Sequence, residues 1–182
     1  IARTAHGWAR LDIRWKRHRR DAFRRRCYSH FEAGERFLSR SYGEITVTYE
    51  AISPKNYYHL SMGSQHEDRF MGELFERYVR PGDTVLDIGA HTGMYSIPFA
   101  RAVGDSGKVY AFEPETQGYS SILRNEELNS LSNIEVIIPT FNEEVNLPAA
   151  LQSVMGWADA VHVVDSESTD RTRDIAIDAG AL

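Results

Sequence analysis

The sequence contains one cysteine, Cys27, in 182 residues, which excludes an internal disulfide framework and a cysteine-rich zinc site. No apolar run approaches the ~20 residues that a membrane-spanning helix needs. The basic N-terminal region lacks the apolar stretch of a signal peptide. Glycine and proline, with 13 and 6 residues, are too few for a low-complexity chain. We therefore expect a globular protein of the cytoplasm.

The net charge of −5 conceals two regions of opposite sign. Residues 1–40 contain 12 Lys and Arg against 4 Asp and Glu, whereas residues 41–182 contain 9 against 22. The positive charge is concentrated between Arg14 and Arg26, a run that can contact nucleic acid or an anionic membrane surface. Apolar residues at three-to-four spacing also make it typical of a solvated helix face. We expect only weak contact with anionic surfaces and no specific nucleic-acid partner.

Short apolar runs alternate with amphipathic stretches through most of the chain. Residues 44–50 alternate strictly between apolar and polar side chains, which predicts a half-buried strand. Further strands are predicted at 84–88, 108–112, 134–138 and 160–164, and helices at 64–79, 93–103, 115–128, 144–155 and 170–179. Strands of about five residues separated by helices indicate an α/β fold. The predicted architecture is a Rossmann-like parallel sheet of about four strands flanked by helices, preceded by a basic helical arm.

The first candidate site lies at residues 87–93, which read DIGAHTG between a predicted strand and helix. Gly89 and Gly93 let the backbone turn sharply beside a ligand, and the start of the helix offers free N–H groups. The next strand ends at Glu113, where a carboxylate can accept hydrogen bonds from ribose hydroxyls. The loop is not G-x-G-x-x-G, which argues against a nicotinamide or flavin cofactor.

The pattern D-x-G-A-x-x-G followed by E-P resembles the S-adenosylmethionine-binding half of class I methyltransferases. VLDIGAHTGMYSIPFARAV followed by GKVYAFEPE is similar to the FkbM-type methyltransferases, over about residues 82–133. The resemblance implies that Glu113 contacts the ribose, and that four residues contact the methionine and sugar parts of the cofactor: Asp87, Gly89, Ala90 and Gly93. A glycine turn in another Rossmann-like protein is the alternative.

His91 lies within this loop and is tempting as a base, although a loop histidine more often caps or packs. The sequence therefore leaves the catalytic residues unassigned.

The second candidate site begins where the chain changes character. Residues 136–144 read VIIPTFNEE and residues 163–172 read VVDSESTDRT, which resembles the opening of the family 2 glycosyltransferases with their GT-A fold. The resemblance implies a nucleotide-sugar site formed by Pro139, Thr140, Asn142, Glu143, Asp165 and Asp170. Asp165 would hold the base of the nucleotide. Glu167 departs from the family, which usually has a small residue there, often glycine.

Neither module is complete in this sequence. The glycosyltransferase part has no later D-x-D motif for a divalent metal and no acidic catalytic base, so no metal site is predicted. The methyltransferase part lacks the later strands that shape an acceptor pocket. We interpret the chain as a chimera of truncated modules: an arm at 1–43, a methyltransferase-like region at 44–133 and a glycosyltransferase-like βαβ fragment at 134–182.

Three functions are compatible with these motifs. The favoured one is a transferase of the FkbM type, incomplete as it stands, which uses S-adenosylmethionine to O-methylate a sugar, glycan or other small hydroxylated acceptor. The second is a fragment of a family 2 glycosyltransferase whose donor is a nucleotide sugar, with a divalent metal only in a complete enzyme. The third is a non-catalytic module that keeps a nucleotide pocket.

The order of the strands decides whether the two motifs share one pocket. The favoured order is 134–138, 108–112, 84–88, 160–164, which places Asp87, Gly89, Glu113 and Asp165 along one carboxyl edge in a single pocket. The competing order is sequential, with 160–164 beside 134–138, and leaves Asp165 remote from the glycine loop. Because each strand is nearly all apolar, we also expect both faces of the sheet to be covered.

Overall fold

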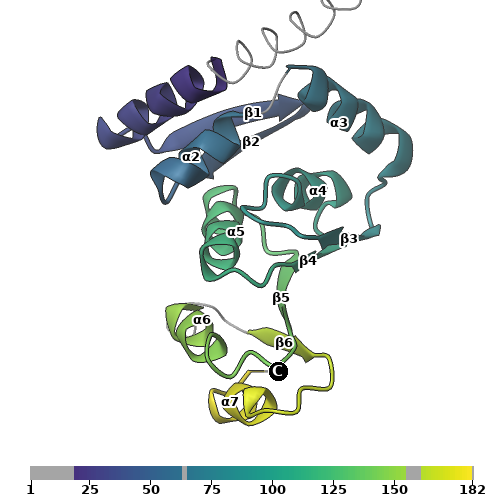
Figure 1. The fold of residues 1–182 in the computed structure, drawn as a ribbon. Helices are drawn as coiled ribbons and strands as arrows, with labels where there is room; N and C mark the ends of the chain where they lie inside the picture. The colour runs from purple at the N-terminus through teal and green to yellow at the C-terminus, as the bar shows by residue number, and fades with distance from the viewer. Residues whose placement is uncertain (1–18, 63–64, 155–160, 182) are drawn as a thin grey trace, which may run out of the picture.

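The computed structural model describes residues 19–62, 65–154 and 161–181 (Figure 1). A helix at residues 19–32 comes first. The elements that follow are β1 (Phe37–Tyr42), β2 (Ile45–Glu50), α2 (Pro54–Ser61), α3 (Gln65–Tyr78), β3 (Thr84–Ile88), α4 (Ser96–Val103), β4 (Lys108–Phe112), α5 (Thr116–Leu128), β5 (Ile134–Thr140), α6 (Leu147–Val154), β6 (His162–Asp165) and α7 (Thr172–Asp178).

The predicted α/β architecture is confirmed. Strands β3, β4, β5 and β6 form a parallel four-stranded sheet flanked by helices. The alternation at residues 44–50 is also confirmed, because Val47 and Tyr49 of β2 are buried whereas Thr46 is exposed.

Strand β1 and helix α2 were not predicted from the sequence. Residues 37–42, which we assigned to the helical arm, form β1 and pair antiparallel with β2. The two strands are joined by a two-residue turn that begins at Gly43, whose φ is +62°. Glycine at the first turn position is the signal for such a hairpin.

The favoured strand order was wrong, and the sequential alternative is correct. The sheet runs β3-β4-β5-β6, so β6 pairs with β5 and not with β3. The ends of these two neighbours are tied together, since the Thr140 hydroxyl donates to the Asp165 carboxylate at 3.3 Å. The predicted common pocket therefore does not form. Asp165 lies three strand spacings, about 14 Å, from Asp87.

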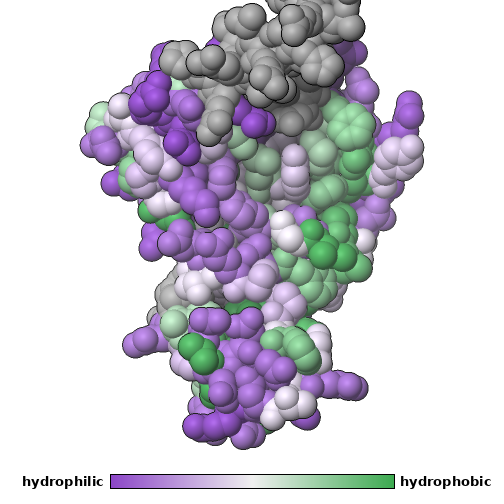
Figure 2. All heavy atoms as spheres, viewed as in Figure 1, coloured by the Kyte–Doolittle hydropathy of each residue, from purple (hydrophilic) through white to green (hydrophobic). Residues whose placement is uncertain are grey.

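The expectation that both faces of the sheet are covered was also wrong. Successive parallel strands joined by right-handed crossovers bring α4, α5 and α6 to the same face, where Val109, Ala111 and Val136 are buried. On the opposite face Leu86 is 61% exposed and Ile88 81%. Figure 2 shows hydrophobic surface at the position that β3 has in Figure 1.

The β1–β2 hairpin packs against α4 and α5 as a further layer, on the side of these helices away from the sheet (Figure 1). Two buried amides hold it there, one from α5 and one from the residue that caps its C-terminal end. Asn125 Oδ1 accepts the Glu50 N–H at 2.7 Å, and Asn129 exchanges two hydrogen bonds with the backbone of Thr48. These two side chains hydrogen-bond the backbone N–H and C=O groups on the edge of β2 that faces away from β1. Without them, these backbone groups would be covered by α5 and left unpaired.

The second half of the basic run lies on the helix at 19–32, where Arg24, Arg25 and Arg26 are exposed to solvent. The first half lies outside the described residues. In the part of the chain that the structure describes, no helix has the length and apolar character to cross a bilayer.

We expect Asn125→Ala to lower the free energy of unfolding by about 1–3 kcal/mol, because the buried Glu50 N–H loses its acceptor. Urea denaturation of the variant and the parent chain measures the change. Glu127→Ala, an exposed position of the same helix, is the matched control. A change for Asn125→Ala no larger than the control's would show that the amide does not hold the hairpin.

Candidate functional site

The glycine loop at residues 87–93 lies at the carboxyl edge of the sheet, where ligands of parallel α/β folds bind. The N–H groups of Gly89 and Ala90 donate to Phe112 O at 3.0 and 3.1 Å. Gly89 has a φ of +82°, and no atom lies within 4 Å of the position that a Cβ would take there. The backbone at Gly89 therefore faces open space that a ligand can occupy.

Gly93 closes the loop under different constraints. Its φ is +77°, and a Cβ there would lie 3.1 Å from Ile122 Cγ1 of α5. Glycine is therefore needed at position 93 because α5 packs closely against the loop, whereas the space above Gly89 is open.

Glu113 fastens the loop to the end of β4. Its Oε2 accepts the His91 N–H and its Oε1 the Glu115 N–H, both at 2.7 Å, and the residue is 5% exposed. Gly118 permits this arrangement, because a Cβ there would lie 2.5 Å from His91 O and 2.7 Å from Glu113 Cγ. The sequence predicted Glu113 as a ligand residue but missed this positioning role.

Asp87 points from β3 toward the start of α4, where Ser96 Oγ donates to its Oδ2 at 2.6 Å. Burial raises the pKa of Asp87 above its ordinary value, while the bond from Ser96 acts in the opposite direction. The Asp87 carboxylate keeps lone pairs that can accept a hydrogen bond from an incoming ammonium or hydroxyl group. Its ionisation in this buried position lowers the stability of the folded state.

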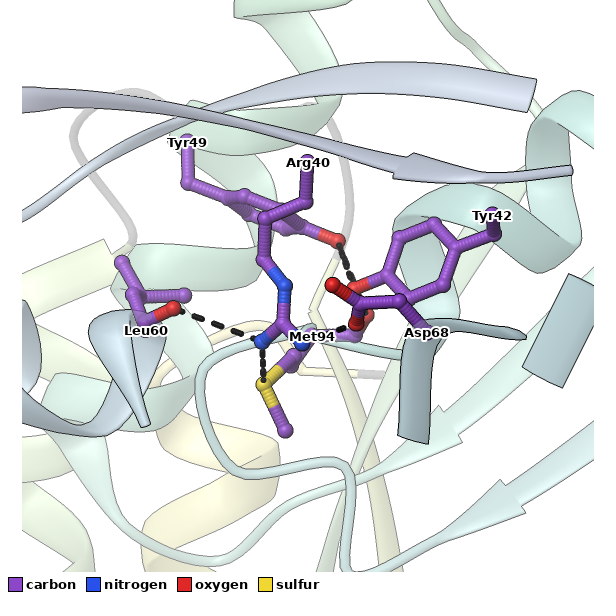
Figure 3. Close-up of polar contacts among 6 residues, drawn as sticks. All are labelled: Arg40, Tyr42, Tyr49, Leu60, Asp68 and Met94. Atoms are coloured by element: carbon purple, nitrogen blue, oxygen red, sulfur yellow. Dashed lines mark hydrogen bonds and ion pairs between the residues drawn. The ribbon is translucent and has the colours of Figure 1, made fainter. Parts of the chain in front are cut away.

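A polar cluster on the hairpin side fixes the loop at Met94 (Figure 3). Arg40 pairs with Asp68 and donates to Leu60 O at 3.3 Å and Met94 Sδ at 2.9 Å. The hydroxyls of Tyr42 and Tyr49 donate to Met94 O at 3.3 and 2.8 Å. The glycine loop is thus held from both sides, by Glu113 and by the hairpin.

No sequence motif predicted this cluster. The only signal is that Arg40 takes an inward position between Leu38 and Tyr42 in the alternation of β1.

A cavity of about 350 Å³ lies at the same edge of the sheet, between the loop that follows β4 and the start of α6. One wall comes from the residues after β4 and the other from β5 and the segment that leads into α6: Pro114, Glu115, Thr116, Ile138, Pro139, Thr140, Glu143, Asn146, Leu147 and Ala150. Three of these belong to the second predicted site, whereas the residues of the first predicted site do not line the cavity. This volume is within the range of small-molecule sites.

The second predicted site forms a compact pair of loops. Asn142 and Glu143 donate their N–H groups to Ser168 Oγ and Thr172 Oγ1 at 2.8 and 2.7 Å. Asp170 Oδ2 accepts the Glu144 N–H at 3.1 Å. These contacts join the loop after β5 to the loop after β6.

Asp165 is engaged within these loops. The Ser168 hydroxyl and N–H and the Thr140 hydroxyl hydrogen-bond its carboxylate and hold its pKa below the ordinary value. Asn142 and Asp165 do not line the 350 Å³ cavity, whereas Pro139, Thr140 and Glu143 do. Glu167 has a φ of +62°, a conformation that glycine adopts without strain, which explains why a small residue is usual there.

Comparison with known proteins finds two kinds of relative. Residues 135–180 match the family model described as Glycosyl transferase family 2, about a quarter of the chain. Several curated relatives are methyltransferases. The chain is 38% identical over 81 residues to the ribosomal RNA large subunit methyltransferase E of Alkalilimnicola ehrlichii, covering 44% of this chain and 34% of that protein.

A second curated relative is protein-L-isoaspartate O-methyltransferase 1 of Arabidopsis thaliana, 29% identical over 112 residues, with 58% of this chain and 46% of that protein covered. The chain thus spans between about a third and a half of the length of these relatives. Among solved structures, a SAM dependent methyltransferase from Aquifex aeolicus aligns at 21% identity and a TM-score of 0.32, over 59% of this chain and 77% of that one.

Within the described residues, no group of three or more His, Cys, Asp or Glu side chains is arranged to hold a metal ion.

We expect Asp87→Asn to be more stable than the parent chain at pH 7. Because burial raises the folded-state pKa of Asp87 above 3.8, its ionisation destabilises the folded state as pH rises from 3.8 through the raised pKa. The variant lacks this ionisation and keeps an acceptor for Ser96. The stability difference, measured by urea denaturation, should vanish below pH 3.8, and Asp105→Asn at an exposed turn is the control. An equal difference at both pH values would contradict this assignment.

Proposed function

We propose that the chain binds S-adenosylmethionine and belongs to a methyltransferase of the FkbM type that acts on a hydroxyl group of a sugar, glycan or other small acceptor. The curated relatives support the general part of this proposal, because their names specify different substrates but agree on methyl transfer. We propose further that residues 134–182 derive from a glycosyltransferase module joined to the methyltransferase-like region at β5.

The observation that carries the proposal is the pair of hydrogen bonds by which the Glu113 carboxylate holds the backbone of His91 and Glu115, which we call the Glu113 clasp. Open space lies above Gly89 on one side of it and the 350 Å³ cavity on the other. Each carboxylate oxygen of Glu113 holds one backbone N–H and keeps a second lone pair for a ribose hydroxyl. The cavity would receive the adenine. Asp87 and the N–H groups at the start of α4 would hold the amino-acid part. When bound, the cofactor supplies an activated methyl group.

The chain's own contribution is then position and charge. The loop is fixed by Glu113 and Met94 before a ligand arrives, so little ordering is needed on binding. The rate of transfer would come mainly from alignment of the acceptor hydroxyl and from removal of its proton.

We expect Glu113→Ala to weaken binding of S-adenosylhomocysteine about tenfold to a hundredfold, because ribose and loop both lose a charged acceptor worth about 1.5–3 kcal/mol. Isothermal titration calorimetry measures the affinity. Asp105→Ala, a carboxylate at the opposite edge of the sheet, is the control. Binding by Glu113→Ala as tight as by the parent chain would remove Glu113 from the site.

The second candidate function is a glycosyltransferase fragment that binds the nucleotide part of a sugar donor. It is favoured by the family match over residues 135–180. It is also favoured by the hydrogen bonds of Asn142 and Asp165 to Ser168, which connect the loops after β5 and β6. These loops lie at the ends of β5 and β6, away from the glycine loop of β3, but Pro139, Thr140 and Glu143 of this site also line the cavity proposed for the adenine.

If both sites exist, uridine diphosphate and S-adenosylhomocysteine should compete, because each would place its base against the wall formed by Pro139, Thr140 and Glu143. Competition calorimetry tests this, with Asp165→Asn expected to weaken only uridine diphosphate. We also expect no glycosyl transfer from this chain, since a diphosphate leaving group needs a metal clamp for which no D-x-D motif is present in the sequence. Metal-dependent turnover of a nucleotide sugar would contradict the second expectation.

A further inference from the structure

Two histidines meet at a small cavity between α2 and the glycine loop. His59 comes from the last turn of α2 and His91 from the loop, and their ring centroids are 5.0 Å apart. His91 has a φ of +53°, a left-handed conformation uncommon outside glycine. Both rings line the cavity, together with Lys55, Asn56 and Glu115.

The cavity holds an unsatisfied polar group. Asn56 is 5% exposed, and its Oδ1 accepts the Ile52 N–H at 3.0 Å, but its Nδ2 has no hydrogen-bond partner among the described residues. A buried donor left unpaired costs about 1–3 kcal/mol, so such groups normally face a water or a ligand. The cavity volume of about 20 Å³ accommodates one water molecule.

The electrostatic surroundings keep His59 neutral. Burial lowers the pKa of His59 below its ordinary value of 6.5, the neighbouring His91 and Lys55 lower it further, and Glu115 at the start of α5 opposes them. The ring of Tyr58 lies 5.7 Å from the His59 ring, centroid to centroid. At pH 7 the pair therefore offers an imidazole nitrogen that can accept a proton.

The position of the pair follows from the proposed function, on which this inference rests. If the base occupied the cavity beside β5 and the ribose lay at Glu113 on β4, the sulfonium end of the cofactor would point toward the loop of β3, the next strand in the sheet. His91 lies in that loop, and its N–H is bound to Glu113 itself.

We propose that His59 and His91 form the proton-accepting pair of the methyl transfer and stand beside the sulfonium, with the Asn56 amide holding a water at their side. The acceptor oxygen forms its bond to the methyl carbon as the carbon–sulfur bond breaks. The electron pair of that bond goes to the sulfur, which becomes a neutral thioether. The hydroxyl proton goes to an imidazole nitrogen and from there to solvent.

A sulfonium and a protonated His59 repel each other, whereas a neutral thioether does not repel the imidazolium. We therefore expect the ratio of dissociation constants, S-adenosylmethionine over S-adenosylhomocysteine, to rise about tenfold between pH 8 and pH 5, the equivalent of one unit of coupled pKa. Titration calorimetry of the parent chain at both pH values measures this ratio, and ionisations common to the two ligands cancel in it.

The double variant His59→Gln with His91→Asn should make the ratio constant within about twofold, while still binding S-adenosylhomocysteine. Asparagine suits position 91 because it tolerates positive φ. His162→Gln, on β6 beside Glu135, is the control and should keep the parent's pH dependence.

A ratio that does not change with pH in the parent chain, or one that still changes in the double variant, would overturn the inference while leaving the cofactor site intact. Failure of the parent chain to bind either ligand would overturn the proposed function, and with it the inference.

Discussion

The side chain of Asn125 connects the three parts on which the candidate site depends. It is fully buried in α5, where its Oδ1 accepts the Glu50 N–H of the hairpin and its Nδ2 donates to Thr92 O of the glycine loop at 3.4 Å and to Ser121 Oγ at 3.3 Å. One amide thus sets the spacing between hairpin, helix and loop. The Arg40 cluster at Met94 and the Glu113 clasp at His91 then act on a loop whose distance from the hairpin is already fixed.

Strand β5 joins the part of the sheet that carries the glycine loop to the part that matches the glycosyltransferase family model. β5 begins with Ile134 beside Val109 of β4 and ends with Thr140 beside Asp165 of β6. Most residues of β5 are buried and apolar, so the strand packs equally well between β4 and β6. The cavity lined by Glu115 and Glu143 lies at this junction, with one wall from the loop after β4 and the other from β5 and the start of α6.

Local patterns were sufficient for most of the fold, whereas relations between distant segments were not. The period-two alternation of β2 and the glycine loop at 87–93 were read from the sequence because each depends on neighbouring residues. The position of β6 was not, since apolar strands of similar composition pair equally well with β3 or β5. Arg40 and Asn125 were missed for the same reason: their partners lie 54 and 75 residues away along the chain, at Met94 and Glu50.

The uncovered face of the sheet has a consequence for how the chain behaves at high concentration. Among the described residues β3 is an edge strand, so its outer row of backbone N–H and C=O groups has no strand beside it. The same strand presents Leu86 and Ile88 to solvent. An open hydrogen-bonding edge next to apolar side chains is a template for adding another strand, and sheets with such edges tend to self-associate. High protein concentration, rather than high temperature, is therefore the condition under which β3 first causes the chain to self-associate.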